Sequence, residues 1–214
     1  MRREMSYEEK YKMMIETPVN KLIPRLAVPT IISMLITSIY NMADTFFVSQ
    51  LSTAASGAVG VNFSLMAMIQ AIGFTLGMGS GNYMSRMLGE KKQEKAQRAC
   101  STAVYTAFVC GLLLAVFGIR NMDSLVRMLG ATETIAPYAK DYGKYILIAA
   151  PYMTVSFVFN NHLRAQGNAA LSMFGITTGG VLNVILDPVL IFHFEMGISG
   201  AAIATILSQF ISFL

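Results

Sequence analysis

The sequence contains few charged side chains, and almost all of them lie outside its long apolar stretches. Asp, Glu, Lys and Arg make up 13% of the 214 residues, whereas 54% are hydrophobic and the mean hydropathy is +0.54. Apolar runs recur at lengths of about 20 residues, enough to cross a hydrocarbon layer about 30 Å thick. This pattern excludes a soluble globular domain and predicts an all-α, polytopic membrane protein.

Cysteine and the motifs of classical enzymes are also scarce. The two cysteines, Cys100 and Cys110, lie on one predicted helix about 15 Å apart, which is beyond the reach of a disulfide bond. His162 and His193 lie at the ends of different predicted spans, and no Ser/His/Asp spacing, Walker-type loop or Cys/His cluster occurs. The sequence therefore predicts neither an enzyme nor a cofactor, and it argues against transport driven by ATP.

The apolar runs predict a bundle of six membrane-spanning helices. We expect these helices near residues 26–48, 55–78, 99–119, 145–161, 171–192 and 198–214. Residues 1–21 form a charged N-terminal segment without the apolar core of a signal peptide, and residues 22–214 form the transmembrane lobe. Because the last run is still apolar where the sequence ends, we expect a sixth helix cut short and a chain that is half of a larger protein.

Lysine and arginine concentrate in two of the polar segments. Six lie in the N-terminal segment and five in the second loop: Arg2, Arg3, Lys10, Lys12, Lys21 and Arg25, then Arg86, Lys91, Lys92, Lys95 and Arg98. The positive-inside rule then places the N-terminus in the cytoplasm and the bundle in the plasma membrane, although four basic residues in the long third loop argue weakly against it. Orientation thus accounts for the net charge of +4, and no nucleic-acid partner is expected.

Two acidic side chains lie inside the apolar runs. They are Asp44, near the outer end of the first span, and Asp187, in the outer half of the fifth. A carboxylate at membrane depth costs about 2.5 to 3.5 kcal/mol, and acids found there usually face the interior of a bundle and serve transport. No Lys or Arg lies within the predicted spans to pair with either acid. Both acids must therefore be protonated, hydrated or bound to a cation, and their shared depth suggests one site.

Neutral oxygen-bearing side chains lie at the same depth. Asn183 precedes Asp187 by one helical turn, Asn41 lies three residues before Asp44, and Thr205 reaches a similar depth on the sixth span. Carboxylate, amide and hydroxyl oxygens suit a proton or Na⁺ and suit soft metals poorly. Asn and Thr in membrane helices also join helices without further function, at about 0.6 kcal/mol each. The two acids favour an ion site.

Prolines and glycines interrupt the predicted helices. Pro29 lies inside the first span and Pro188 directly follows Asp187, so we expect a helix kink at each and free backbone carbonyls beside the acid. Gly73 and Gly77 form a small-xxx-small pair in the second span, which predicts close packing against another helix.

Five segments in order resemble a known transporter family. They are YNMADTFFVSQL at 40–51, the loop MSRMLGEKKQEKAQRA, the stretch LRAQGNAALSM, the run GGVLNVILDPVLI and the final GISGAAIATILSQ. Together they are similar to multidrug and toxic compound extrusion (MATE) transporters from about Pro18 onward. One departure is that Ser49 and Gln50 replace the Gly and basic residue that often follow the first-helix Asp in the family.

The resemblance implies a fold and an activity. MATE transporters have twelve helices in two six-helix lobes, open alternately to each side, and expel cationic or amphiphilic compounds in exchange for H⁺ or Na⁺. This chain resembles the first lobe, so the resemblance implies drug-like substrates, the lipid bilayer and a C-terminal six-helix lobe as partners. Carried over residue by residue, the cation site comprises Asp44, Asn183, Asp187 and Thr205, to which Asn160 or Asn161 is a further candidate.

Two other functions fit the sequence less well. A lipid or lipid-linked polysaccharide flippase of the same superfamily is expected to line its cavity with basic residues, and none lies within the predicted spans. A nonfunctional fragment or a structural membrane subunit is favoured only if no second lobe exists.

Overall fold

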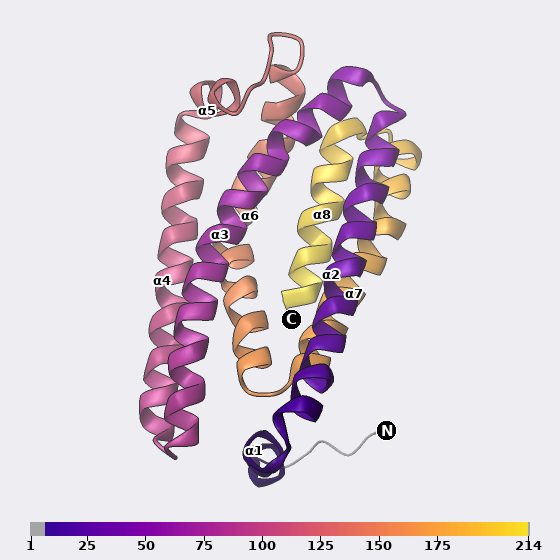
Figure 1. Cartoon of the computed structure of the whole chain (residues 1–214). Helices are drawn as coiled ribbons and strands as arrows, with labels where there is room; N and C mark the ends of the chain where they lie inside the picture. Colours follow the sequence, from indigo (N-terminus) through magenta and orange to yellow (C-terminus); the bar gives the residue numbers. More distant parts are fainter. Residues whose placement is uncertain (1–6, 214) are drawn as a thin grey trace.

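The computed structural model describes the backbone of residues 7–213 and the side chains of residues 12–213. Within this part of the chain there is no strand. The helices, in order, are α1 (Tyr7–Glu16), α2 (Val19–Ser49), α3 (Thr53–Gly89), α4 (Gln93–Arg120), α5 (Met122–Met128), α6 (Ala136–Ala165), α7 (Ala169–Pro188), the π-helical η1 (Val189–His193) and α8 (Gly197–Phe213). The predicted all-α class is confirmed (Figure 1).

Four segments are long and apolar enough to cross a membrane by length and composition: Val19–Ser49, Thr53–Gly89, Gln93–Arg120 and Ala169–His193. The predicted span at 145–161 lies within α6, and residues 198–213 of the last predicted span lie within α8, while residue 214 lies outside the described residues. Most helices extend beyond the apolar runs, because polar residues continue the helix past the hydrocarbon layer. Only three of the 31 residues of α2 are buried, namely Ser33, Asp44 and Val48. The exposed apolar side chains of α2 suit contact with lipid.

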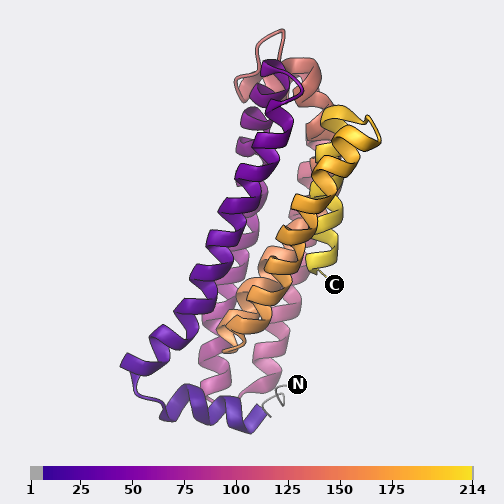
Figure 2. The ribbon, with the colours of Figure 1, turned by 90° about the vertical axis from the view of Figure 1, so that its right-hand side faces the viewer.

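The long helices form two groups. Helices α3, α4 and α6 pack on one another, helices α2, α7 and α8 form the second group, and the packing of α6 on α8 joins the two. Figure 1 shows the groups side by side, with α5 at one end of the bundle and α1 at the other. These ends are called the α5 end and the α1 end below. Figure 2 shows α1 lying across the bundle, beside the start of α2.

Glycines allow α3 to approach α6 closely. A Cβ added to Gly73 would lie 2.5 Å from the Cβ of Phe157, and one added to Gly77 would lie 3.0 Å from the Cβ of Asn161. These contacts lie beside the backbone of α6, so flexible side-chain ends cannot relieve them. The close packing expected from the small-xxx-small pair is confirmed.

The two prolines noted in the sequence have different surroundings. Pro29 lies inside α2, which remains helical on both sides of it. Pro188 is the last residue of α7, and the π-helical η1 begins at Val189. Proline has no N–H to donate to the preceding turn, so the regular helical hydrogen bonding is interrupted directly after Asp187.

Candidate functional site

Five buried polar side chains from four helices meet toward the α5 end of the bundle. We call them the Asp44–Asp187 cluster: Asp44 from α2, Tyr142 from α6, Asn183 and Asp187 from α7, and Thr205 from α8. Asp44 is 6% exposed and Asp187 is fully buried. The structure thus brings together the four residues predicted for the cation site and adds a tyrosine to them.

Hydrogen bonds connect the two acids through the other three side chains. The Asn183 amide donates to Asp187 Oδ1 at 3.2 Å and to Thr205 Oγ1 at 3.5 Å. Thr205 Oγ1 lies 3.5 Å from the Tyr142 hydroxyl, which donates to Asp44 Oδ2 at 3.4 Å. Because the tyrosine proton is used at Asp44, the threonine must donate to the tyrosine. Three of the bonds therefore run in one direction, from Asn183 through Thr205 and Tyr142 to Asp44, and the fourth runs from Asn183 to Asp187.

The cluster has more acceptors than donors. Those four bonds use both amide hydrogens of Asn183, the hydroxyl hydrogen of Thr205 and that of Tyr142. Asp44 Oδ1, Asn183 Oδ1 and Asp187 Oδ2 are buried and have no hydrogen-bond partner among the described residues. Since a buried acceptor without a partner is costly, these three oxygens are available to a bound donor or cation. Oxygen atoms of this kind suit a proton or Na⁺.

A second buried amide fixes the helical turn that carries Tyr142. Asn62 of α3 donates to the carbonyl of Ala139 in α6 at 3.0 Å and to its own helix at Ala58. Gly143 makes room for it, because a Cβ there would lie 2.6 Å from Asn62 Oδ1. These hydrogen bonds hold the start of α6 against α3. They thereby help to position Tyr142, which lies three residues after Ala139.

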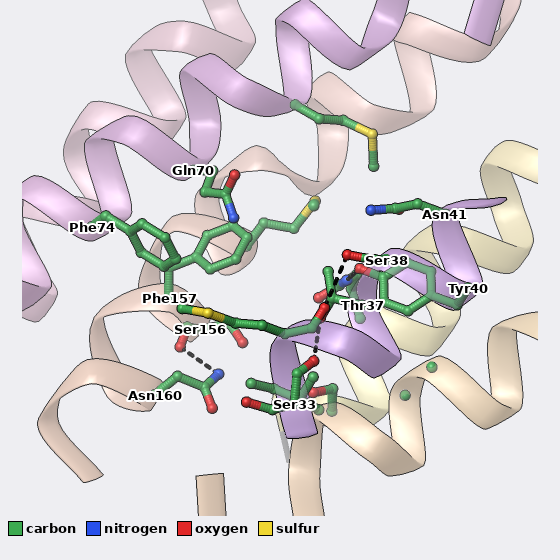
Figure 3. A pocket seen from close by; sticks show the side chains of 18 of the residues that line it. Ser33, Thr37, Ser38, Tyr40, Asn41, Gln70, Phe74, Ser156, Phe157 and Asn160 are labelled. Atoms are coloured by element: carbon green, nitrogen blue, oxygen red, sulfur yellow. Dashed lines mark hydrogen bonds between the residues drawn. The ribbon is translucent and has the colours of Figure 1, made fainter. Parts of the chain in front are cut away.

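A cavity of about 410 Å³ lies between the two groups of helices. Residues of α2, α3, α6, α7 and α8 line it. Figure 3 shows Ser33, Thr37, Ser38, Tyr40 and Asn41 on α2 facing Gln70 and Phe74 on α3, with Ser156, Phe157 and Asn160 on α6. Its wall mixes aromatic and thioether side chains with neutral hydrogen-bonding groups. That volume and lining are typical of a site for a small ligand.

The cavity and the cluster share four helices, and on two of them, α2 and α8, their residues lie one turn apart. Tyr40 precedes Asp44 by one turn of α2, and Gln209 follows Thr205 by one turn of α8. The Gln209 amide donates to the Tyr40 hydroxyl at 3.1 Å, and both residues line the cavity. In the cluster, Tyr142 connects α2 to α8 through its contacts with Asp44 and Thr205. One turn toward the α1 end, the Tyr40–Gln209 hydrogen bond connects the same two helices in the cavity wall.

The three further asparagines lie outside the cluster. Asn41 points into the cavity, as Figure 3 shows, and forms no described hydrogen bond with the cluster. Asn160 and Asn161 lie 18 and 19 residues beyond Tyr142 on α6, about 27 Å along the helix. Asn161 packs against Gly77 of α3. The structure therefore does not bring either α6 asparagine to the predicted cation site.

The sequence analysis missed two residues. Tyr142 precedes the apolar run at 145–161 and was assigned to a loop, whereas α6 begins at Ala136 and carries it into the bundle. Arg164 follows that run, but α6 continues to Ala165 and places it in the cavity wall. No Lys or Arg lies within the predicted span itself, but α6 is longer than that span, so a basic residue reaches the cavity wall. Leu163, Arg164 and Ala165 favour helix and were an available signal after the run, whereas Pro137, Asp141 and Gly143 before it gave none.

Comparisons with known proteins identify the family of the chain. A family model described as MatE matches residues 29–189. The multidrug export protein MepA of Staphylococcus haemolyticus is 30% identical over 198 residues, covering 92% of this chain and 44% of that protein. MepA of Staphylococcus aureus is 29% identical over 195 residues, covering 91% and 43%.

A solved structure shares the fold. The outward-facing conformation of a multidrug resistance MATE family transporter of the MOP superfamily matches with a TM-score of 0.90 and 28% identity, covering 99% of this chain and 46% of that one. The chain therefore spans less than half the length of these relatives. The resemblance noted in the sequence is confirmed: the chain belongs to the MatE family of transporters.

Proposed function

We propose that this chain forms one lobe of a secondary active exporter that couples entry of H⁺ or Na⁺ to expulsion of drug-like amphiphiles. The observation that carries the proposal is the excess of buried acceptor oxygens in the Asp44–Asp187 cluster. An added proton or Na⁺ would complete the hydrogen bonding or coordination of those oxygens. The MepA relatives, which are multidrug export proteins, support the direction of transport.

The proposed coupling uses the contact between the cluster and the cavity. When a cation neutralises the acids, the bonds that join α2, α6 and α8 through Tyr142 and Thr205 rearrange. The Tyr40–Gln209 hydrogen bond lies one turn away in the cavity wall, so the same movement changes the shape of the cavity. A ligand that prefers one shape then competes with the cation, as coupled exchange requires.

The proposal also requires a second lobe as a partner of this chain. Alternating access in transporters built from repeats requires one bundle to rock against another around a central site. Reconstituted alone in liposomes, this chain is therefore expected not to export a fluorescent cation such as ethidium. Export by the isolated chain, with cross-linking showing a monomer, would contradict the requirement for a partner lobe.

Cation binding can be tested on the purified chain without a partner. We expect it to bind ²²Na⁺, or to take up protons measured with a pH indicator, in detergent. Asp44→Asn and Asp187→Asn should each reduce this binding at least tenfold, because each removes a carboxylate ligand. Asp123→Asn is the matched control, since Asp123 lies on α5, is exposed and is paired with Lys140. Unchanged cation binding in both cluster variants would overturn the proposed coupling site.

A further inference from the structure

The charge of the central cavity is set by one side chain. Among the described residues that line it, Arg164 is the one charged group, and no Asp, Glu or Lys shares the wall. The two acids of the cluster are buried behind this wall and do not line it. The cavity therefore presents a positive charge to a ligand, whereas the MATE resemblance implied cationic or amphiphilic substrates.

Arg164 is held in place by neutral groups. Its Nε donates to Ser172 Oγ at 3.3 Å, and the Ser172 hydroxyl donates in turn to Asn160 Oδ1 at 2.8 Å. The Asn160 amide donates to the carbonyl of Ser156 at 3.0 Å, so each member of the chain is itself fixed. Ser172 is 1% exposed, which makes this a buried support rather than a surface contact.

The guanidinium keeps most of its donors. Among residues 12–213 it forms no ion pair, and the bond from Nε to Ser172 uses one of its five N–H groups. None of the remaining nitrogens is both fully buried and without a partner, so they are at least partly accessible. A planar, oriented guanidinium with free N–H groups matches the two oxygens of a carboxylate or phosphate.

The rest of the wall suits an apolar ligand body. Phe74 and Phe157 pack edge to face with ring centres 5.5 Å apart, and Met34, Met66 and Met153 also line the cavity. Thioether and aromatic side chains adapt to varied apolar shapes. We propose that the cavity binds amphiphiles whose anionic head, a carboxylate or phosphate, is bound by Arg164 while the apolar body lies against these side chains. This assignment names the substrate class of the proposed transporter and rests on that function.

A matched pair of ligands tests the assignment on the purified chain in a neutral detergent. The probes are dansyl-undecanoate and a dansyl-undecyl trimethylammonium, which share a tail and differ in the charge of the head. We expect the carboxylate probe to bind at least tenfold more tightly than the ammonium probe. Arg164→Gln should weaken the carboxylate probe at least tenfold and leave the ammonium probe unchanged or bound more tightly. Arg164→Lys should bind the carboxylate probe with an affinity between those of the unmodified chain and Arg164→Gln. Lysine keeps the positive charge but lacks the two parallel N–H donors of the guanidinium.

Arg98→Gln is the control for loss of one positive charge. Arg98 lies toward the same end of the bundle, is 79% exposed and pairs with Glu94, so binding of both probes should be unchanged. Thermal unfolding of each variant reports whether the fold is kept, and Arg164→Lys remains informative if Arg164→Gln is unstable. Equal affinity of the chain and both Arg164 variants for the carboxylate probe would overturn the assignment, as would tighter binding of the ammonium probe by the unmodified chain.

The anionic head can belong to an exported compound or to a membrane lipid, and nanodiscs separate the two. If lipid is the ligand, discs containing phosphatidylglycerol should displace the carboxylate probe, whereas discs of phosphatidylcholine alone should not. If a soluble amphiphile is the ligand, the probe should remain bound in both kinds of disc and be displaced by free laurate. These measurements use no ion gradient, so a failure of coupling at the Asp44–Asp187 cluster would not alter them.

Discussion

The hydroxyl of Tyr142 lies 3.4 Å from Asp44 Oδ2, although 98 residues separate them in the sequence. The same hydroxyl lies 3.5 Å from Thr205 Oγ1. One side chain of α6 therefore joins α2 to α8 inside the cluster, and α6 belongs to the other group of helices. Tyr142 is thus the cluster residue through which the two groups contact each other.

Replacing this tyrosine tests its bridging role. Tyr142→Phe keeps the ring and removes the hydroxyl, so Asp44 loses its described hydrogen-bond donor. We expect thermal stability in detergent to fall by about 1 kcal/mol, because a buried acceptor loses its partner. We also expect cation binding to change several-fold, measured with ²²Na⁺ or as proton uptake.

Tyr152→Phe is the matched control on the same helix. Tyr152 donates to the carbonyl of Ile206 at 2.6 Å and touches neither acid. The Tyr152→Phe variant should lose about as much thermal stability as Tyr142→Phe and should bind the cation as the unmodified chain does. If both variants bind the cation as the unmodified chain does, Tyr142 serves only to pack α6.

The sequence predicted some residues of the Asp44–Asp187 cluster but not all of them. Asp44 and Asp187 stand out because carboxylates are rare in apolar runs, and the spacing of Asn183 to Asp187 places both on one helix face. Tyr142 could not be identified this way, because the charged neighbours Asp141 and Lys144 resemble a loop. A tyrosine buried at the end of a helix depends on the packing of other helices over it, which periodicity does not report.

The fold was predictable to the level of its helices but not of their ends. The first four apolar runs each lie within one helix, because hydrophobic length fixes where the chain crosses the membrane, whereas the fifth run is divided between α7 and η1. The helix α3 nevertheless runs on to Gly89, well past the expected end at residue 78, since backbone hydrogen bonding continues where the side chains become polar. The short α1 lies in a segment for which the sequence predicted no element, and it packs against Gly167 through Met14.

The close approach of α3 to α6 predicts opposite effects for two glycines on one helix. Gly73→Ala should destabilise the chain by about 1 to 3 kcal/mol, because its Cβ would meet the Cβ of Phe157 at 2.5 Å. Gly79 has no neighbour within 4 Å of an added Cβ, so Gly79→Ala should be neutral or stabilise by up to about 1 kcal/mol. Thermal unfolding in one detergent compares them. Equal melting temperatures would show that the helices separate without cost.

The basic residues predict the orientation of the bundle, and labelling can measure it. The connection between α3 and α4, which holds Glu90, lies at the α1 end, and the connection between η1 and α8, which holds Glu195, lies at the α5 end (Figure 1). In a background with alanine at Cys100 and Cys110, Glu90→Cys should be shielded from an impermeant maleimide in intact cells. Glu195→Cys should react. The reverse pattern would place the N-terminus outside and turn the Asp44–Asp187 cluster toward the cytoplasm.

The two acids should behave as one site rather than two. In the complete two-lobe transporter, Asp44→Asn and Asp187→Asn should each abolish drug efflux driven by an imposed H⁺ or Na⁺ gradient. Each should keep or raise thermal stability, because the neutral amide removes the cost of a buried charge without a charged partner.

The double variant, which carries both substitutions, tests more strongly whether the two acids form one site. If both carboxylates bind the same cation, the first substitution already removes the site, and the double variant should transport scarcely less than either single one. Two independent sites would instead lose coupling in two separate steps, with partial efflux left in each single variant. Gradient-driven efflux and melting temperature measured on all four proteins distinguish these outcomes, with Asp123→Asn as the control. Near-normal efflux in both single variants would show that the cluster does not couple transport to an ion.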